Sequence, residues 1–223
     1  MAEPLKMITP AMLADDPFRP ARVDFEKGLS SAPAFAIGLI IVNVLVFALE
    51  IKLSLLTSRK DVIYAGAVYG EKVFAGQSWR LVTGMFMHAN LGHLFGNCLA
   101  LYLVGMAAEQ AWGRRRSLAI YFISGLAASF ASAFLGTRPS VGASGALFGL
   151  MGAVMVFFFR HGNSFYARNR RVGNFLIAWS LLQLWLGSLN PRVDNWAHLG
   201  GMLAGSIIGA YMPSRFFEDK AAS

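Results

Sequence analysis

The sequence VGASGALFG at residues 141–149 opens an uncharged run that continues to Phe159. This run of 19 residues is long enough to cross the hydrocarbon core of a membrane as a helix. Ser144 stands near its start between Gly142 and Gly145, so its hydroxyl is uncrowded and other backbone can approach it. At a helix N-terminus, unpaired N–H groups and the positive end of the helix dipole would face a developing oxyanion.

The same stretch can also be interpreted as a helix-packing surface without a catalytic role. Gly145 and Gly149 form a Gly-x-x-x-Gly pair, which lets membrane helices pack closely. Taken alone, the stretch favours this packing role, because small residues are ordinary in membrane helices. Polar residues in two other apolar runs shift the balance towards chemistry: His198 in a later run, and His93 with Asn97 in an earlier one.

The composition is that of a membrane protein with several spans. The 223 residues are 56% hydrophobic and 14% charged, with a mean hydropathy of +0.50. The basic residues that give the net charge of +8 lie between the apolar runs, where they indicate the orientation of the chain in the membrane. We therefore do not expect nucleic-acid binding. The single Cys98 cannot form an intrachain disulfide.

Six apolar runs predict an all-α membrane protein, a bundle of six transmembrane helices. We expect a cytoplasmic tail at residues 1–31, without a cleavable signal peptide, a membrane domain at 32–212, and a second cytoplasmic tail at 213–223. The connection from Glu50 to Arg80 mixes charged and aromatic residues, which predicts a folded first loop associated with the membrane interface. The expected spans are 32–49, 90–110, 117–136, 141–159, 172–189 and 196–212.

Basic residues predict the orientation. With the N-terminus in the cytoplasm, 13 of the 20 Lys and Arg residues fall in cytoplasmic segments. The two cytoplasmic loops then hold three and four arginines, against one in each short outer loop. Both termini are therefore expected in the cytoplasm, and Ser144, His198 and His93 near the outer face.

His93 and Asn97 are spaced i, i+4 and project from one helical face. An ionisable side chain within a span is costly against lipid, so His93 should face protein or a wet cavity. A purely packing role for His93 is the alternative. On the last span, Gly201, Gly205 and Gly209 follow His198 at intervals of four residues and form a groove. If that groove meets the glycine pair of residues 141–149, the serine and the histidine lie at matching depth.

These residues resemble those of the rhomboid family of intramembrane serine proteases. The resemblance runs from Trp79 to Gly209, and five motifs occur in order on the expected spans. One departure is Phe148, where relatives often have a tyrosine stacked on the catalytic histidine; phenylalanine can still pack there. The motifs are Trp79-Arg80, HANLGHLFGN at 88–97, Gly105-x-x-x-Glu109-x-x-x-Gly113, Gly142-Ala143-Ser144-Gly145 and Ala197-His198-x-x-Gly201-x-x-x-Gly205.

The resemblance implies a bacterial six-span protein of the inner membrane that cleaves transmembrane segments of other proteins near the outer face. It implies that Ser144 is the nucleophile, that His198 is the general base, and that His93 and Asn97 help to form the oxyanion hole. Packing at the site is expected for Gly142 and Phe148. Structural roles are expected for Trp79, Arg80, His88, Glu109, Gly145, Gly149, Gly201 and Gly205.

The chemistry also follows from the residue types, because a serine hydroxyl is a poor nucleophile until a base removes its proton. Asp194 precedes His198 by four residues and is expected to cap a turn or helix, which favours a Ser–His dyad over a triad. We expect no cofactor and no metal, since the histidines lack carboxylates or thiols at ligand spacing. The expected partners are transmembrane protein substrates and the lipid bilayer.

Two other functions are the alternatives. A non-catalytic membrane escort would bind client helices on the same fold, and loss of the serine or histidine would indicate it, but both residues are present. A small-molecule transporter predicts internal inverted repeats or paired broken helices, and the sequence has neither.

Overall fold

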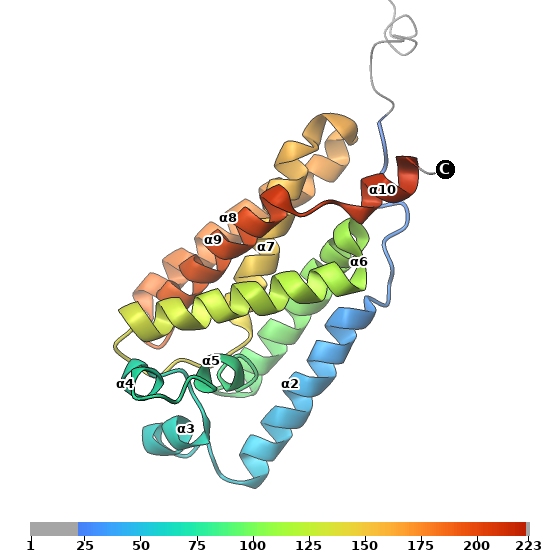
Figure 1. The fold of residues 1–223 in the computed structure, drawn as a ribbon. Helices are drawn as coiled ribbons and strands as arrows, with labels where there is room; N and C mark the ends of the chain where they lie inside the picture. Colours follow the sequence, from blue (N-terminus) through green and yellow to red (C-terminus); the bar gives the residue numbers. More distant parts are fainter. Residues whose placement is uncertain (1–21, 222–223) are drawn as a thin grey trace, which may run out of the picture.

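The computed structural model describes residues 22–221, and helices dominate this part of the chain (Figure 1). Within these residues, β-structure is confined to two isolated bridges, Val23 with Phe165 and Val68 with Ser140. The predicted all-α fold is confirmed. The helices are α2 (Ala34–Lys52), α3 (Arg59–Ala65), α4 (Gly70–Phe74), α5 (Arg80–Thr83), α6 (Leu91–Leu135), α7 (Ser144–Arg160), the 3₁₀ helix η1 (Gly162–Ser164), α8 (Ala167–Leu189), α9 (Asn195–Tyr211) and α10 (Arg215–Ala221).

Helix α6 contains two of the expected spans in one element of 45 residues. Gly113 interrupts it with φ 74° and ψ 170°, a left-handed conformation that glycine adopts without strain. The chain turns back at this point, so the two halves of α6 run in different directions (Figure 1). Each half corresponds to one expected span.

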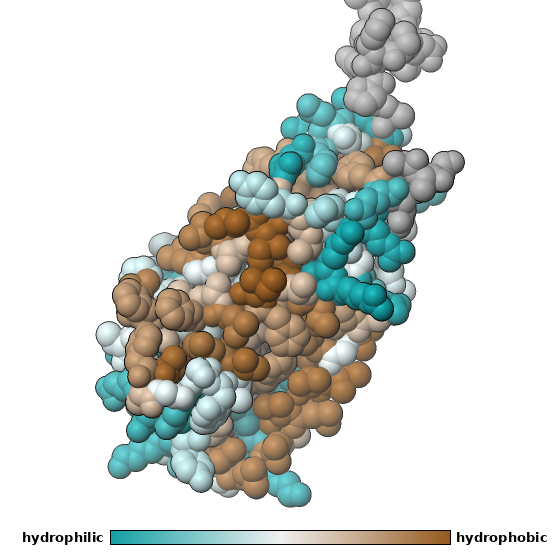
Figure 2. Space-filling model, viewed as in Figure 1, coloured by the Kyte–Doolittle hydropathy of each residue, from teal (hydrophilic) through white to brown (hydrophobic). Residues whose placement is uncertain are grey.

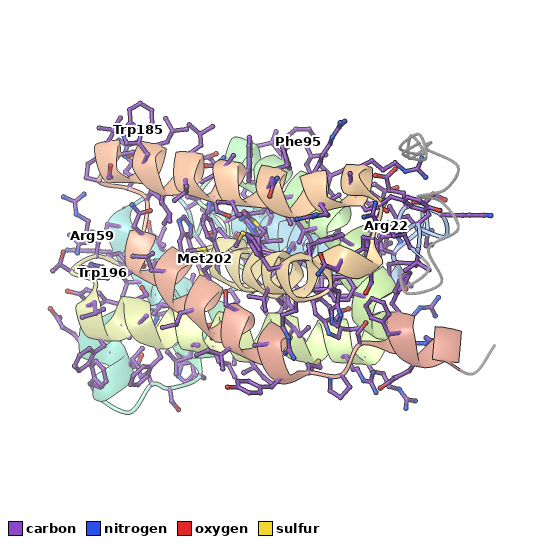
Figure 3. The ribbon with its side chains drawn as sticks, turned by 90° about the horizontal axis from the view of Figure 1, so that it is seen from above. Arg22, Arg59, Phe95, Trp185, Trp196 and Met202 are labelled. Atoms are coloured by element: carbon purple, nitrogen blue, oxygen red, sulfur yellow. The ribbon has the colours of Figure 1, made fainter. Side chains whose placement is uncertain are left out.

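The surface is that of a membrane bundle. Helices α2, α6 and α8 are long and apolar enough to cross a membrane, and α7 is a shorter apolar helix. Hydrophobic residues cover the sides of the bundle, and hydrophilic residues gather towards its two ends (Figure 2). Phe95 on α6 and Trp185 on α8 point away from the bundle, where lipid would surround them (Figure 3). The helical membrane bundle is confirmed, whereas the crossing of the bilayer by all six segments stays a prediction.

Helix α7 is the centre of the bundle. It is apolar on every side, and 13 of its 17 residues are buried, as expected for a helix enclosed by others. The glycine faces of α7 and α9 meet, as their spacing predicts. A Cβ on Gly201 would lie 2.0 Å from the carbonyl oxygen of Gly145, and one on Gly205 would lie 1.9 Å from that of Gly149. The two backbones are therefore in direct contact.

Arg80 holds the first loop together at one end of the bundle. Its Nη1 donates to the carbonyl oxygens of Ile63 and Ala67, and its Nε donates to Gln77 Oε1 at 2.7 Å. The guanidinium also lies 4.5 Å from the centre of the Trp79 ring. The first loop is thus folded, as predicted, and its position at the membrane interface stays a prediction.

The opposite end carries both terminal segments (Figure 1). Residues 1–21 of the expected first tail lie outside the described residues, and residues 22–31 contact the bundle through the buried Phe25. Phe25 is only 1% exposed, because its ring packs against those of Phe158, Phe165 and Phe216. Contacts among these aromatic rings hold this part of the chain against the bundle, while its place in the cytoplasm stays a prediction.

Candidate active site

The structure brings Ser144 and His198 into hydrogen-bond contact. Ser144 is the first residue of α7 and His198 lies in the first turn of α9. The distance from Ser144 Oγ to His198 Nε2 is 2.9 Å, and His198 is buried. The close approach of the two helices through their glycines makes this distance possible. A base at this distance can accept the serine proton.

Phe148 packs on the imidazole of His198, and Asp194 caps the helix that carries it. Phe148 lies one turn after Ser144, and its ring stacks on His198 with centroids 4.2 Å apart and planes 8° from parallel. Asp194 is the N-cap of α9: its side chain accepts hydrogen bonds from the Ala197 N–H and the Ser132 hydroxyl. His198 Nδ1 has no hydrogen-bond partner within residues 22–221. The Asp194 side chain therefore caps α9 and makes no hydrogen bond with the imidazole of His198.

His93 and Asn97 line the backbone just before the serine. Gly142 has φ 127°, and a Cβ there would lie 2.8 Å from His93 Nε2 and 3.4 Å from Asn97 Nδ2. Only glycine leaves room for both side chains at this point. Asn97 is buried, and its Nδ2 has no partner among the described residues. An unpaired buried amide is costly unless a ligand accepts its hydrogen bond.

The segment before Ser144 is tied to the first loop. Val68 and Ser140 exchange two backbone hydrogen bonds, of 2.9 and 2.8 Å. The Gly142 N–H donates to the carbonyl oxygen of Gly84 at 2.8 Å. These bonds hold Gly142 in place beside His93 and Asn97.

A small cavity borders Ser144. Its volume is about 20 Å³, which is room for about one water molecule. Hydroxyl groups occur on its wall beside apolar residues, so the space suits a water molecule. The walls include Val68, Gly84, Ser129, Ser132, Ser140 and Gly142.

His88 supports the site from outside the spans. Its backbone N–H donates to Glu50 Oε2 at 3.3 Å, and its Nδ1 lies 3.0 Å from the carbonyl oxygen of Phe86. Burial and the neighbouring His93 lower the pKa of His88 to about 4, so it is neutral near pH 7. Its ring meets that of His93 edge to face at 5.3 Å. The buried Glu50 was missed from the sequence, where its only signal is a carboxylate at the end of an apolar run.

The other predicted residues make contacts in the first loop, at the opposite end and between helices. Glu109 is at the opposite end, where it accepts from the Phe35 N–H at the start of α2 and pairs with Arg114 at 3.0 Å. Trp79 and Arg80 lie in the first loop, and the glycines at 145, 149, 201 and 205 form the contact of α7 with α9. Within residues 22–221, no three His, Cys, Asp or Glu side chains come together as a metal site requires.

Residues 75–215 match the sequence model of the Rhomboid domain. The chain is 33% identical over 202 residues to "Rhomboid protease AarA" of Providencia stuartii, covering 79% of this chain and 72% of that relative. It is 34% identical over 154 residues to "Rhomboid protease GluP" of Bacillus subtilis, covering 69% and 30%. It is 42% identical over 147 residues to "RHOMBOID-like protein 5" of Arabidopsis thaliana, covering 65% and 47%. The matches thus span less than half the length of the last two relatives.

Proposed function

This chain belongs to the rhomboid family, and we propose that it is a serine endopeptidase that hydrolyses peptide bonds within transmembrane segments of other proteins. The observation that carries the proposal is the 2.9 Å distance between Ser144 Oγ and His198 Nε2. General-base activation of a serine requires this reach, and the stacked Phe148 ring favours one orientation of the imidazole. An escort that only binds client helices has no need of this contact.

The proposed reaction follows from the arrangement of Ser144 and His198. His198 Nε2 takes the proton of Ser144 as Oγ attacks the peptide carbonyl carbon, giving a tetrahedral oxyanion. Collapse breaks the C–N bond, His198 gives its proton to the leaving amine, and an acyl group stays on Ser144. A water molecule then attacks the acyl carbon with His198 as base, which releases the carboxylic acid product and restores the serine.

The oxyanion is assigned to three donors: the backbone N–H of Ser144, Asn97 Nδ2 and His93. The N–H lies in the first turn of α7, where helix amides are unpaired and the dipole favours negative charge. The support for Asn97 is its unpaired, buried amide beside Gly142. One preorganised donor of this kind contributes about 3 kcal/mol to transition-state stabilisation.

The proposed topology places cleavage near the outer membrane face, with both termini in the cytoplasm of a bacterium and the protein in its inner membrane. The basic loops contact the terminal segments: Arg116 pairs with Glu218, and Arg168 pairs with Asp24. Arginine-rich ends of membrane proteins face the cytoplasm. Ser144 lies at the other end, beside the first loop. A substrate helix must unwind to reach it, and small or helix-breaking residues lower that cost.

Two measurements on the full chain in proteoliposomes test the proposal. A fluorophosphonate should label Ser144, and a co-reconstituted single-span substrate should be cleaved. Ser144→Ala and His198→Ala should each abolish cleavage, while Ser188→Ala, a matched change on the exposed α8, should preserve it. Labelling at full rate in His198→Ala would assign activation to another base. Retained substrate binding without any cleavage by the unaltered chain would favour the escort.

A further inference from the structure

A second cavity lies at the end of the bundle opposite Ser144. It has a volume of about 860 Å³, within the range of sites that hold small molecules or lipid headgroups. Its walls come from three separate segments: residues 27–30, the α6 kink around Gly113, and α10. The positive φ of Gly113 turns the two halves of α6 apart and so creates one side of the cavity.

The walls of this cavity are basic. Two of the arginines are already paired, Arg114 with Glu109 and Arg116 with Glu218. The side chains of Lys27 and Arg115 are exposed and have no ion pair or hydrogen bond with any residue that the structure describes. Cations exceed carboxylates by three, since Lys27, Arg114, Arg115, Arg116 and Arg215 face Glu109 and Glu218.

The cavity also has two aromatic residues in its wall, and an exposed apolar surface lies nearby. Trp112 and Phe216 contribute to the wall, and Trp112 is only 2% exposed. Its indole N–H has no hydrogen-bond partner within residues 22–221. The hydrophilic patch at the kink of α6 borders a continuous hydrophobic surface (Figure 2), and Leu103 and Leu118 on either side of the kink are exposed. A soluble anion would gain nothing from this border, whereas a lipid would use both parts.

We propose that this cavity binds the phosphate group of an anionic phospholipid, with its acyl chains along the exposed apolar side of α6. Arg115 offers a planar fork of donors that matches phosphate oxygens, and Lys27 adds a point charge from a separate segment. Basic pockets at the inner border of a membrane are typical sites for anionic headgroups. A bound headgroup would link residues 27–30, the α6 kink and α10.

The test uses the full chain in detergent micelles, titrated with phosphatidylglycerol and followed by native mass spectrometry. The variant Lys27→Gln/Arg115→Gln removes the two unpaired cations. The matched control Arg160→Gln/Arg171→Gln removes two exposed arginines outside the cavity walls and changes the net charge equally. The Kd for phosphatidylglycerol should rise about 10-fold in the first variant and less than about 2-fold in the control, because only the first loses direct phosphate contacts. Fluorophosphonate labelling of Ser144 should be equal in all three proteins, which verifies folding.

Several outcomes would overturn the proposal. Equal weakening in both variants would mean that overall charge attracts the lipid, and no weakening in either would mean that the cavity is not the site. Phosphatidylcholine binding as tightly as phosphatidylglycerol would remove the role of net negative charge. Glycerol 3-phosphate displacing phosphatidylglycerol at equal concentration would reassign the cavity to soluble phosphates.

Discussion

Helices α7 and α9 touch backbone to backbone, whereas α8 lies against the bundle with most of its surface exposed. Along α7, 13 of 17 residues are buried, but in α8 only five of 23 are. Glycines make the first contact: Gly152 approaches the carbonyl of Met202 so closely that a Cβ would lie 2.5 Å from it. Large side chains of α8, including Trp185, point outward instead (Figure 3).

The comparison separates α7 and α9, whose spacing must stay fixed, from α8, whose position can change. The proposed dyad needs a stable spacing between α7 and α9, because a displacement of about 1 Å can cost about 100-fold in rate. On the other side, α8 meets α9 through the bond from Asn195 Nδ2 to the Leu184 carbonyl oxygen, at 2.9 Å. Few buried contacts indicate low local stability. We expect a transmembrane substrate to approach from the side of α8.

Gly205→Ala should break the tight contact and have the largest effect. The added methyl group would lie 1.9 Å from the Gly149 carbonyl oxygen, so the helices must separate. Peptide cleavage should fall by about 100-fold or more, and overpacking should lower the free energy of unfolding by about 1–3 kcal/mol. Gly38→Ala on α2 is the control, because nothing lies within 4 Å of its added Cβ. Equal behaviour of the two variants in cleavage and thermal-melting assays would refute the need for close contact.

Asn97→Ala leaves the α7–α9 contact intact and tests the chemistry beside it. Turnover should fall about 10-fold or more with little change in substrate binding, because the lost donor acts mainly in the transition state. Asn174→Ala makes the same change on the exposed surface of α8 and should leave steady-state cleavage unaltered. Normal turnover in Asn97→Ala would remove this residue from the oxyanion hole.

Phe148→Ala should reduce cleavage by roughly 2- to 10-fold, the equivalent of the 0.5–1.5 kcal/mol of an aromatic pair. The imidazole of His198 loses the ring that stacks on it at 4.2 Å. Phe148→Tyr should be tolerated, and Phe175→Ala on the surface of α8 should have no such effect. Rates are compared per labelled Ser144, so that loss of folded protein is corrected. An inactive tyrosine variant beside an active alanine variant would contradict the packing argument.

Asn195→Ala should have the smallest effect on cleavage, less than about 2-fold, because it loosens α8 without touching the dyad. The loss of one hydrogen bond, worth about 1 kcal/mol, should raise deuterium exchange in the last turn of α8 about 5-fold. A loss of activity as large as that of Asn97→Ala would show that the attachment of α8 positions the dyad, and the contrast between the two regions would disappear.

Local patterns predicted much of this fold. The lengths of the apolar runs indicated each helical segment, and the glycine spacing predicted the contact between α7 and α9. Both patterns are periodicities of a single helix, which can be read without knowing its neighbours. The depth of Ser144 and His198 followed from the same spacing.

Contacts between distant residues could not be predicted in this way. Glu50 meets His88 across 38 residues, and Phe25 meets Phe216 across nearly the whole chain. Such pairs depend on how complete helices dock, and nothing in the residues near Phe25 distinguishes a docked aromatic from an exposed one. The turn at Gly113 could not be predicted either, because a glycine before three arginines is as compatible with a loop as with a kink inside one helix.

The contact of Gly201 and Gly205 with backbone carbonyls has a genetic consequence. Every single-nucleotide change of a glycine codon that alters the residue introduces a side chain with a Cβ or ends the chain. At these two positions that Cβ would lie within 2.0 Å of the oxygen of Gly145 or Gly149, and a backbone oxygen cannot rotate aside as a side chain can. We therefore expect no single-nucleotide missense change at either codon to be neutral. A saturation-mutagenesis library selected for activity should retain only glycine at both positions, whereas Gly38 should accept other residues.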